Sequence, residues 1–335
     1  MKTIFYLCLC ASLIATVHHA VSAKAKPWRA VHLLDYNTDE ALEALGQNLE
    51  NLSKQGINTI ILEVDYNFAF KTHPELRRGT TPMTPEGAKK FAKLCKHFNI
   101  RLIPQFQSLG HQSWKAETFS LLTVYPKFDL TPGAFPNNDG IYCREWDPLN
   151  PEVWKVVFQL MDEILDAFHA DAFHVGMDEI FLLGHEQSPA TKGKDPSVLF
   201  ANAVKEIHTH LKSKKVEMLM WGDRLIDGKK YQMGDWESAT NGTAGAVDLI
   251  PKDIIVCPWH YEVREDYPSI PMFIEKGFRV LPAGWRDLDA MRALISYSQK
   301  NSNPKLLGFM FTTWGVKKES LLDFPPLVEG LKLLQ

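Results

Sequence analysis

The sequence predicts one α/β domain built as a (β/α)8 TIM barrel, in which eight parallel strands alternate with helices. Three observations lead to this fold class. The chain has 335 residues, 45% of them hydrophobic, which is enough for a large core. Short β-rich runs alternate with helical patterns along most of its length. Polar and aromatic residues gather just after these runs, where a barrel exposes the ends of its strands.

Eight runs rich in β-branched and aromatic residues are candidate strands. They cover residues 30–34, 59–64, 100–105, 172–177, 217–221, 254–257, 279–281 and 307–311. Parallel strands need covering crossovers, and eight of them close without a free edge. An open doubly wound sheet is the alternative, although no glycine-rich phosphate loop follows the first run. Helical spacing is weakest over residues 225–253, where we expect a long loop.

Helix start and stop signals separate these runs. Thr38 is the predicted N-cap of a first helix, whose leucines recur at helical spacing and which Gly56 should end. Thr84 is the predicted N-cap of a second helix, with proline at its first position. Asn150 and Asp195, each also followed by proline, predict two further helices that begin in the same way.

The N-terminus has the pattern of a secretory signal peptide. Lys2 precedes an apolar run over residues 4–17, and small residues up to Ala23 form a cleavage site. We therefore expect residues 1–23 to be a signal peptide and residues 24–335 to be the barrel domain. The mature chain would be secreted or periplasmic and would have no membrane span. A retained N-terminal membrane helix is the alternative.

Charge and cysteine content exclude some classes of protein. The formal net charge of −3 gives no electrostatic case for binding nucleic acid or an anionic membrane. Without the signal peptide, three cysteines remain, an odd number that argues against a disulfide framework. Cys95 and Cys257 lie in apolar patterns and are interpreted as buried hydrophobic residues. The sequence gives no indication of the oligomeric state.

The segment 172–179 is the most informative part of the chain. Strand alternation places His174, Gly176 and Asp178 on one face, with apolar residues on the other. Glu179 follows directly and can turn toward the same pocket, so that two carboxyl groups share one ligand. A solvated loop opened by an Asp-Glu pair is the alternative, but a histidine and a glycine on the face of the aspartate count against it.

Four tryptophans occupy equivalent places at or just after the last four predicted strands. They are Trp221, Trp259, Trp285 and Trp314. One such residue would indicate core packing, but four predict an aromatic wall around a pocket. Flat apolar rings suit the C–H faces of a sugar, whose hydroxyls would then bind carboxylates and arginine. We therefore expect these four tryptophans to bind a carbohydrate.

Residues 174–179 match the His-x-Gly-x-Asp-Glu signature of glycoside hydrolase family 20, and the chain resembles the β-N-acetylhexosaminidases of that family. Residues 103–111 resemble the third strand of the family and its Gly-His turn. Residues 28–29, at the first strand, resemble the segment that carries the sugar-binding arginine of the family. Residues 62–66 resemble the hexosaminidase D branch, which has no extra N-terminal domain. The resemblance covers most of residues 28–315.

The resemblance implies a retaining exo-β-N-acetylhexosaminidase that releases terminal β-linked GlcNAc or GalNAc from a glycan or glycoconjugate, without a cofactor or metal. In this family the 2-acetamido oxygen of the substrate is the nucleophile, and an oxazolinium intermediate forms. Glu179 would protonate the leaving oxygen and later deprotonate water. Asp178 would accept the acetamido N–H and stabilise the positive charge of the intermediate.

The resemblance also implies roles for binding residues. Arg29 would hold the ring hydroxyls, and Tyr261 would bind the acetamido oxygen, whereas His111 and His174 would orient their neighbours. As alternatives, Arg29 could form a surface ion pair, and Tyr261 could be a core or surface residue. Either histidine could instead form its hydrogen bonds within the core. Further polar candidates are Glu63, Asp223 and Glu262.

Two other functions compete with this interpretation. One is a barrel metallohydrolase, such as an amidase or deacetylase, with His32, Asp35, His174 and Asp178 as ligands, although their spacing matches no metal-binding motif. The other is a secreted carbohydrate-binding barrel without catalysis, which would have no need of the adjacent acids. The choice between GlcNAc and GalNAc, and the natural glycan, depend on contacts that the sequence does not define.

Overall fold

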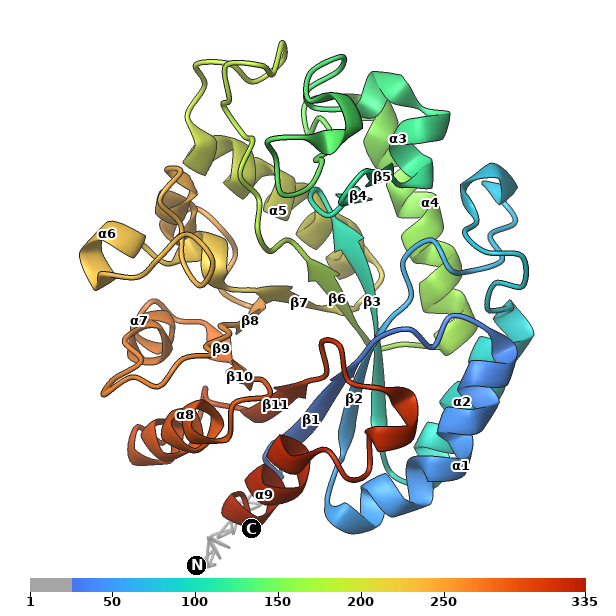
Figure 1. The fold of residues 1–335 in the computed structure, drawn as a ribbon, viewed down its shortest axis with the longest axis vertical. Coiled ribbons are helices and arrows are strands. Elements are labelled where there is room, and N and C mark those ends of the chain that lie inside the picture. Colours follow the sequence, from blue (N-terminus) through green and yellow to red (C-terminus); the bar gives the residue numbers. More distant parts are fainter. Residues whose placement is uncertain (1–25) are drawn as a thin grey trace, which may run out of the picture.

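The computed structural model describes residues 26–335, and its strands are arranged around a barrel axis (Figure 1). The predicted signal peptide, residues 1–23, lies outside the described residues and stays a prediction. The main strands are all parallel. They are β1 (Trp28–Leu33), β2 (Thr59–Glu63), β3 (Arg101–Ser108), β6 (Ala172–Gly176), β7 (Glu217–Trp221), β8 (Ile255–Cys257), β9 (Arg279–Val280), β10 (Ala283–Gly284) and β11 (Gly308–Thr312).

The barrel closes at its seventh strand position, which β9 and β10 share. The strand order is β10-β11-β1-β2-β3-β6-β7-β8-β9. Because Leu281 and Pro282 alone separate β9 from β10, the two ends of this order are one continuous segment. Leu281 N–H donates to Val256 on one side of the segment, and Met310 N–H donates to Pro282 on the other. The predicted (β/α)8 barrel is thus confirmed, and the open-sheet alternative is wrong.

Helices cover the outside of the barrel. The longer ones are α1 (Asp39–Gln55), α2 (Pro85–His97), α4 (Pro151–Phe168), α5 (Pro196–Ser213), α7 (Ser269–Glu275), α8 (Leu288–Lys300) and α9 (Pro325–Leu333). The four predicted N-caps are confirmed, since each side chain accepts a hydrogen bond from a backbone N–H in the first turn. Gly56 ends α1 with φ of 110°, a left-handed conformation that glycine adopts without strain.

Two long connections lie at the carboxyl ends of the strands. The connection after β3 contains β4 (Ser113–Trp114), β5 (Glu117–Thr118), α3 (Ser120–Val124), η2 (Pro126–Phe128) and η3 (Pro136–Asn138). The connection after β7 contains η4 (Asp223–Leu225), α6 (Gly228–Tyr231) and η5 (Thr243–Asp248). The predicted long loop over 225–253 is confirmed, because short turns replace a full helix there. The remaining short turns are η1 (Pro74–Leu76) and η6 (Lys318–Ser320).

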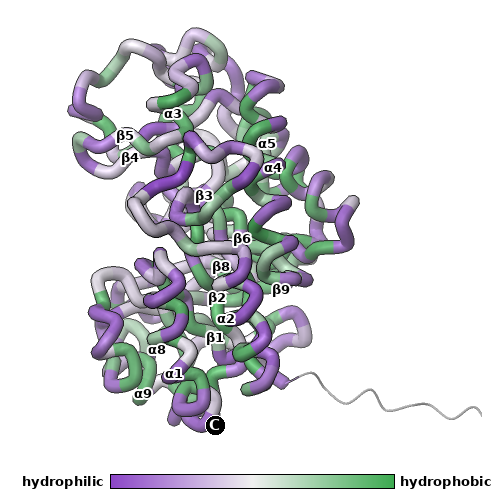
Figure 2. The backbone as a smooth tube through the Cα atoms, turned by 90° about the vertical axis from the view of Figure 1, so that its right-hand side faces the viewer, coloured by the Kyte–Doolittle hydropathy of each residue, from purple (hydrophilic) through white to green (hydrophobic). Residues whose placement is uncertain are grey.

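The core has two layers. A small cluster fills the barrel, and a larger one lies between the strands and the helices; Figure 2 shows hydrophobic stretches on β1 and β2. Phe173, Val175 and Met177 belong to the outer layer, which confirms the predicted alternation in β6.

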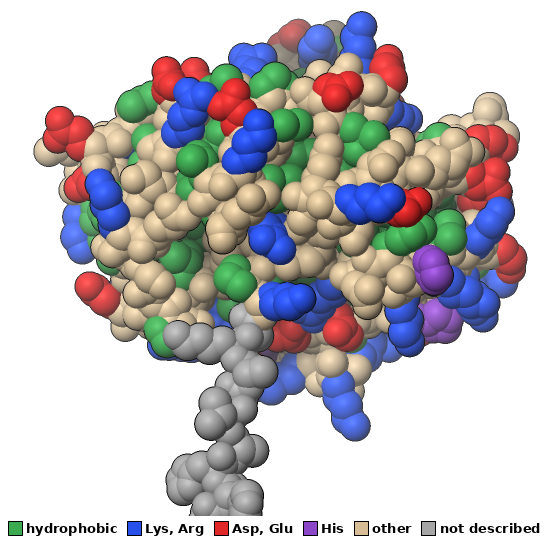
Figure 3. All heavy atoms as spheres, turned by 90° about the horizontal axis from the view of Figure 1, so that it is seen from below, with side chains coloured by type: hydrophobic (Ala, Val, Ile, Leu, Met, Phe, Trp, Pro, Cys, Tyr) green, Lys and Arg blue, Asp and Glu red, His purple; other side chains and the backbone are tan. Residues whose placement is uncertain are grey.

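In the described part of the chain, the three cysteines are buried free thiols, and none of the helices has the length and apolarity that a membrane span requires. Acidic and basic side chains are interspersed on the face in Figure 3.

Candidate active site

A cavity of about 770 Å³ opens at the carboxyl ends of the barrel strands. Every strand position contributes to its lining, as expected for a barrel that binds a ligand at this end. The aromatic lining consists of Trp114, Phe119, Tyr142, Trp221, Trp236, Trp259, Tyr261, Trp285 and Trp314. The ionisable lining includes Asp35, Glu63, Asp65, Arg78, His111, Glu117, Asp178, Glu179, Glu237, Glu262 and Arg264.

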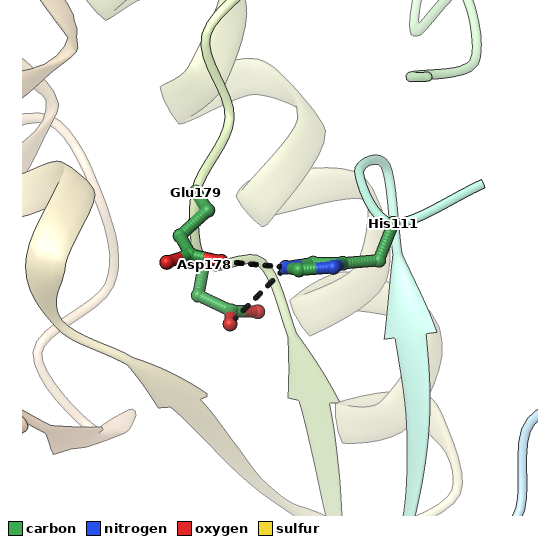
Figure 4. A group of neighbouring side chains, drawn as sticks. All are labelled: His111, Asp178 and Glu179. Atoms are coloured by element: carbon green, nitrogen blue, oxygen red, sulfur yellow. Dashed lines mark ion pairs between the residues drawn. The ribbon is translucent and has the colours of Figure 1, made fainter. Parts of the chain in front are cut away.

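Asp178 and Glu179, which line this cavity, both point toward His111 (Figure 4). The His111 Nε2 atom lies 3.3 Å from Oδ2 of Asp178 and 3.3 Å from Oε2 of Glu179. Adjacent residues in a strand face opposite sides, but Met177 and Glu179 have φ of 70° and 52°. This left-handed backbone interrupts the alternation, so that two consecutive carboxyl groups face the same ligand space.

His111 and Asp178 form a charged pair. Burial disfavours the imidazolium form of His111 and lowers its pKa, whereas the negative charge of Asp178 is the largest of several effects that raise it. Together these effects outweigh burial, so the pKa of His111 lies well above its usual range. Burial likewise disfavours the carboxylate, but the charge of His111 and the hydrogen bond from Gln107 lower the pKa of Asp178. The two shifts together favour the Asp178 carboxylate beside the His111 imidazolium.

Gln107 also positions Asp178, and sequence reasoning missed it. Its Nε2 donates to Oδ1 of Asp178 over 2.9 Å. The side chain passes directly over Gly176, where a Cβ atom would overlap its oxygen. Because Gly176 has no side chain, Gln107 occupies the space beside it. A glutamine inside an otherwise buried strand was the signal that could have identified this residue.

Two buried carboxylates hold the backbone that follows Asp178. Oδ2 of Asp223 accepts from the N–H of Glu179 over 2.8 Å, and Oε1 of Glu145 accepts from the N–H groups of Phe181 and Leu182 over 2.6 and 2.7 Å. Burial raises the pKa of Asp223 to about 6 and that of Glu145 to about 7. Asp223 was a candidate from the sequence, but it does not line the cavity. Glu145 was missed, because it lies in an irregular loop.

The other two polar candidates line the cavity at different depths. Glu63 lies beside Asp65 in the wall formed by the second strand position. Burial and then the charge of Asp65 raise the pKa of Glu63 well above its usual range, while burial raises the pKa of Asp65 to about 6. Glu262 is exposed at the rim, where it pairs with Arg264 at 3.2 Å.

The four predicted tryptophans line the cavity together with Tyr261. Trp314 Nε1 donates to the Tyr261 hydroxyl over 2.9 Å, and Trp285 Nε1 donates to the carbonyl of Trp314 over 2.9 Å. The Tyr261 ring lies 4.9 Å from the Trp259 ring and 5.3 Å from the Trp285 ring, between centroids. These contacts join the side chains into one wall of fixed geometry.

The model of the glycosyl hydrolase family 20 catalytic domain matches residues 51–288. The chain belongs to glycosyl hydrolase family 20. This family 20 protein is 26% identical over 235 residues to hexosaminidase D of Bos taurus, covering 66% of this chain and 59% of the relative. It is 25% identical over 162 residues to lacto-N-biosidase of Bifidobacterium bifidum, covering 45% of this chain and 14% of the relative. The chain therefore matches only part of each relative.

A solved structure supports the fold of this family 20 protein. The Flavobacterium johnsoniae chitobiase superimposes with a TM-score of 0.66 at 19% sequence identity. The match covers 92% of this chain and 48% of the chitobiase. At this identity the similarity supports the barrel alone.

Two residues that the resemblance assigned to the binding site do not line the cavity of this family 20 barrel. Arg29 is at the start of β1, where its Nε donates to the carbonyl of Gly56 over 2.7 Å. The cavity is at the other end of the strand, so the prediction for Arg29 is wrong. His174 is fully buried beneath the cavity and packs against Trp221, with 4.6 Å between ring centroids. His174 therefore does not line the cavity, and its role in orienting neighbouring residues stays a prediction. Burial lowers its pKa to about 3.

The residues that the metallohydrolase hypothesis names as metal ligands do not come together around one point in the family 20 site. That hypothesis needs His32, Asp35, His174 and Asp178 around one ion. Within residues 26–335, His111, Asp178 and Glu179 are the one group of three potential ligands whose atoms lie within 4.8 Å of one another. Neither His32 nor His174 belongs to this group.

Proposed function

We propose that this family 20 hydrolase is a retaining exo-β-N-acetylhexosaminidase acting on terminal β-linked GlcNAc or GalNAc. The observation that carries the proposal is the meeting of Asp178, Glu179 and His111 in a cavity lined by tryptophans. Hexosaminidase D of Bos taurus, by its name, acts on the same class of sugar. The adjacent acids suit a reaction in which the 2-acetamido group of the substrate is the nucleophile.

In the first step the acetamido oxygen attacks the anomeric carbon, and the bond from that carbon to the leaving oxygen breaks. Glu179 gives its proton to the leaving oxygen, and a cyclic oxazolinium ion forms. Asp178 accepts a hydrogen bond from the acetamido N–H and stabilises the positive charge that develops on this group. The lowered pKa of Asp178 keeps it anionic for this task.

In the second step Glu179, now a carboxylate, takes a proton from water, which attacks the anomeric carbon from the face that the leaving group vacated. The carbon–oxygen bond of the oxazolinium ring breaks and the acetamido group is restored. Two displacements at one carbon retain the β configuration. The imidazolium of His111, 3.3 Å from Glu179, stabilises the carboxylate that exists between the steps.

Tyr261 and the tryptophan wall bind the sugar in this proposal. Trp314 donates to the Tyr261 hydroxyl, and Oγ1 of Thr312 lies 3.3 Å from the same oxygen. With a sugar bound, the Tyr261 hydroxyl turns its proton toward an acceptor in the cavity. The acetamido oxygen is the acceptor that the mechanism provides. The flat indole rings bury the apolar faces of the sugar and of the acetamido methyl group.

Hydrolysis of 4-nitrophenyl N-acetyl-β-glucosaminide tests the function. Wild type should turn over and release the β anomer first, as seen by proton NMR. Asp178→Asn should lose about two to three orders of magnitude in kcat. Glu206→Gln, an exposed glutamate of α5, is the matched control and should keep full activity. Initial release of the α anomer, or full activity of Asp178→Asn, would contradict the mechanism.

Glu179→Gln separates catalysis from binding. This variant should turn over very slowly and yet bind the sugar with the affinity of the wild type, because the amide keeps the shape of the acid. A carbohydrate-binding barrel without catalysis is the second candidate, which Asp178 and Glu179 disfavour. Sugar binding by calorimetry without turnover of any N-acetylhexosaminide by the wild type would favour that candidate.

A further inference from the structure

Tyr261 is held at both ends, and its backbone is held by a side chain from another loop. Its N–H donates to Oε1 of Glu237 over 2.9 Å, and its hydroxyl accepts from Nε1 of Trp314 over 2.9 Å. The residue before it, His260, still donates its N–H to the carbonyl of Ala283, as a barrel strand does. Pairing between strands therefore ends at His260, and Glu237 supplies the acceptor for the next N–H.

Glu237 links the connection after β7 to the segment after β8. Besides the N–H of Tyr261, its carboxylate accepts from Nδ1 of His260, which lies 2.8 Å from Oε2. The side chain lines the cavity but is only 9% exposed. Burial raises the pKa of Glu237, but the hydrogen bonds from His260 and from Tyr261 lower it overall. Because both oxygens already accept from the protein, Glu237 acts on Tyr261 and not directly on a ligand.

His260 anchors Glu237 to the outer helices. Its Nε2 lies 2.7 Å from Oγ of Ser269, the first residue of α7, and the side chains of His260 and Ser269 are fully buried. Serine, histidine and an acid in this order also form the catalytic triad of serine hydrolases. Ser269, however, does not line the cavity, so no substrate reaches its Oγ. The three residues therefore fix the carboxylate that holds Tyr261.

We propose that Glu237 is the positioning residue for Tyr261 and fixes where the Tyr261 hydroxyl meets the 2-acetamido oxygen of the substrate. The Tyr261 ring packs against Trp259 and Trp285, so a shift of its backbone displaces the whole side chain. Small displacements of a group that contacts the reacting part of a substrate lower turnover strongly. This inference rests on the proposed function, because that function assigns the acetamido oxygen to Tyr261.

Two substitutions of Glu237 separate the reach of its side chain from its charge. Glu237→Gln keeps the length and the acceptor for Tyr261, and its amide donates to Nδ1 of His260 once the imidazole proton is on Nε2. Glu237→Asp keeps the charge, but it is one methylene shorter and cannot contact both partners. By calorimetry, Glu237→Gln should bind GlcNAc within about twofold of the wild-type affinity. Glu237→Asp should bind it roughly three- to tenfold more weakly, the scale of one hydrogen bond.

Tyr261→Phe tests whether the effect passes through the tyrosine hydroxyl. This variant should itself weaken GlcNAc binding by a similar factor, and adding Glu237→Asp to it should cause no further loss. The kcat/KM for 4-nitrophenyl N-acetyl-β-glucosaminide should follow the same pattern, with a loss of about ten- to a hundredfold in Glu237→Asp. Glu265→Ala, at an exposed glutamate of the same segment, is the control and should change neither quantity.

Three results would overturn the positioning role. They are wild-type affinity in Glu237→Asp, a loss in Glu237→Gln as large as that in Glu237→Asp, and equal losses from Glu237→Asp with and without the Tyr261 hydroxyl. A protein that binds no GlcNAc would contradict both this role and the proposed function.

The binding measurements separate this inference from the proposed function. If the wild type binds GlcNAc but hydrolyses no N-acetylhexosaminide, and the loss in Glu237→Asp still disappears in Tyr261→Phe, the proposed function is wrong and the positioning role is supported. If the wild type hydrolyses the substrate and the two losses add, the positioning role is wrong and the proposed function is supported.

Discussion

Asp223 accepts a hydrogen bond from the backbone N–H of Glu179 over 2.8 Å, although the two residues follow different strands of the barrel. The same Asp223 oxygen accepts from Nε of Arg224 over 2.7 Å. Both side chains of this ion pair are fully buried. A buried charge pair therefore fixes the backbone position of the proposed acid, and the two adjacent carboxyl groups depend on a residue that never reaches the cavity.

Replacing Asp223 should reduce both stability and turnover. Asp223→Ala removes the acceptor for Glu179 and leaves the Arg224 charge buried without its partner, so the free energy of unfolding should fall by about 3 kcal/mol in urea titrations. A displaced Glu179 should lower kcat by about a hundredfold. Asp248→Ala, at an exposed carboxylate, is the control. A wild-type kcat in Asp223→Ala would show that this hydrogen bond does not position the acid.

Glu145 should make stability depend on pH. Burial raises its pKa from the usual 4.5 to about 7 in the folded state, so the folded protein binds the proton more tightly than the unfolded chain. Ionisation of Glu145 therefore lowers the free energy of unfolding as pH rises from about 4.5 to 7. The loss is on the order of 3 kcal/mol. Glu145→Gln keeps the acceptor oxygen for Phe181 and Leu182 but cannot ionise.

Urea titrations of the wild type and Glu145→Gln between pH 4.5 and 7.5 measure this effect. The glutamine variant should gain stability relative to the wild type as pH rises through this window. A constant difference between the two proteins would mean that Glu145 has the same pKa in the folded and unfolded states.

Local signals explain why so much of the fold was predictable. The strands follow from runs of β-branched residues, and Thr38, Thr84, Asn150 and Asp195 cap helices through contacts within one turn. Closure of the barrel followed from the number of strands. The long connection after β7 was predictable as a loop because it lacks helical spacing.

Contacts between distant segments explain what the sequence did not reveal. Gln107 meets Asp178 from 71 residues away, and Glu145 meets Phe181 from 36 residues away. Nothing local marks either contact. Arg29 was misplaced because a two-residue similarity does not define which end of a strand faces the cavity. Alternation correctly placed His174 on the inner face, but depth along the barrel axis determines whether an inner residue reaches the ligand.

His111 should set the acidic limit of activity. Without its positive charge, burial dominates at Asp178, and the pKa of this carboxyl should rise. Because the proposed mechanism needs Asp178 as an anion, His111→Asn should lose activity at a higher pH than the wild type does. Profiles of kcat/KM against pH measure the shift of the acidic limb. An acidic limb at the same pH in both proteins would show that His111 does not control the ionisation of Asp178.

Gly176 should tolerate no side chain while Gln107 is present. Its φ of 66° is unfavourable for alanine by roughly 1–2 kcal/mol, and a Cβ atom would overlap the Gln107 oxygen that lies above it. Gly176→Ala should therefore lower the free energy of unfolding by about 2–4 kcal/mol and reduce kcat, since Gln107 is pushed away from Asp178. Shortening Gln107 removes the overlap but not the backbone strain. The double variant Gly176→Ala/Gln107→Ala should accordingly be more stable than the sum of the two single effects, while kcat stays low. Additive losses of stability would show that the two side chains do not compete for this space.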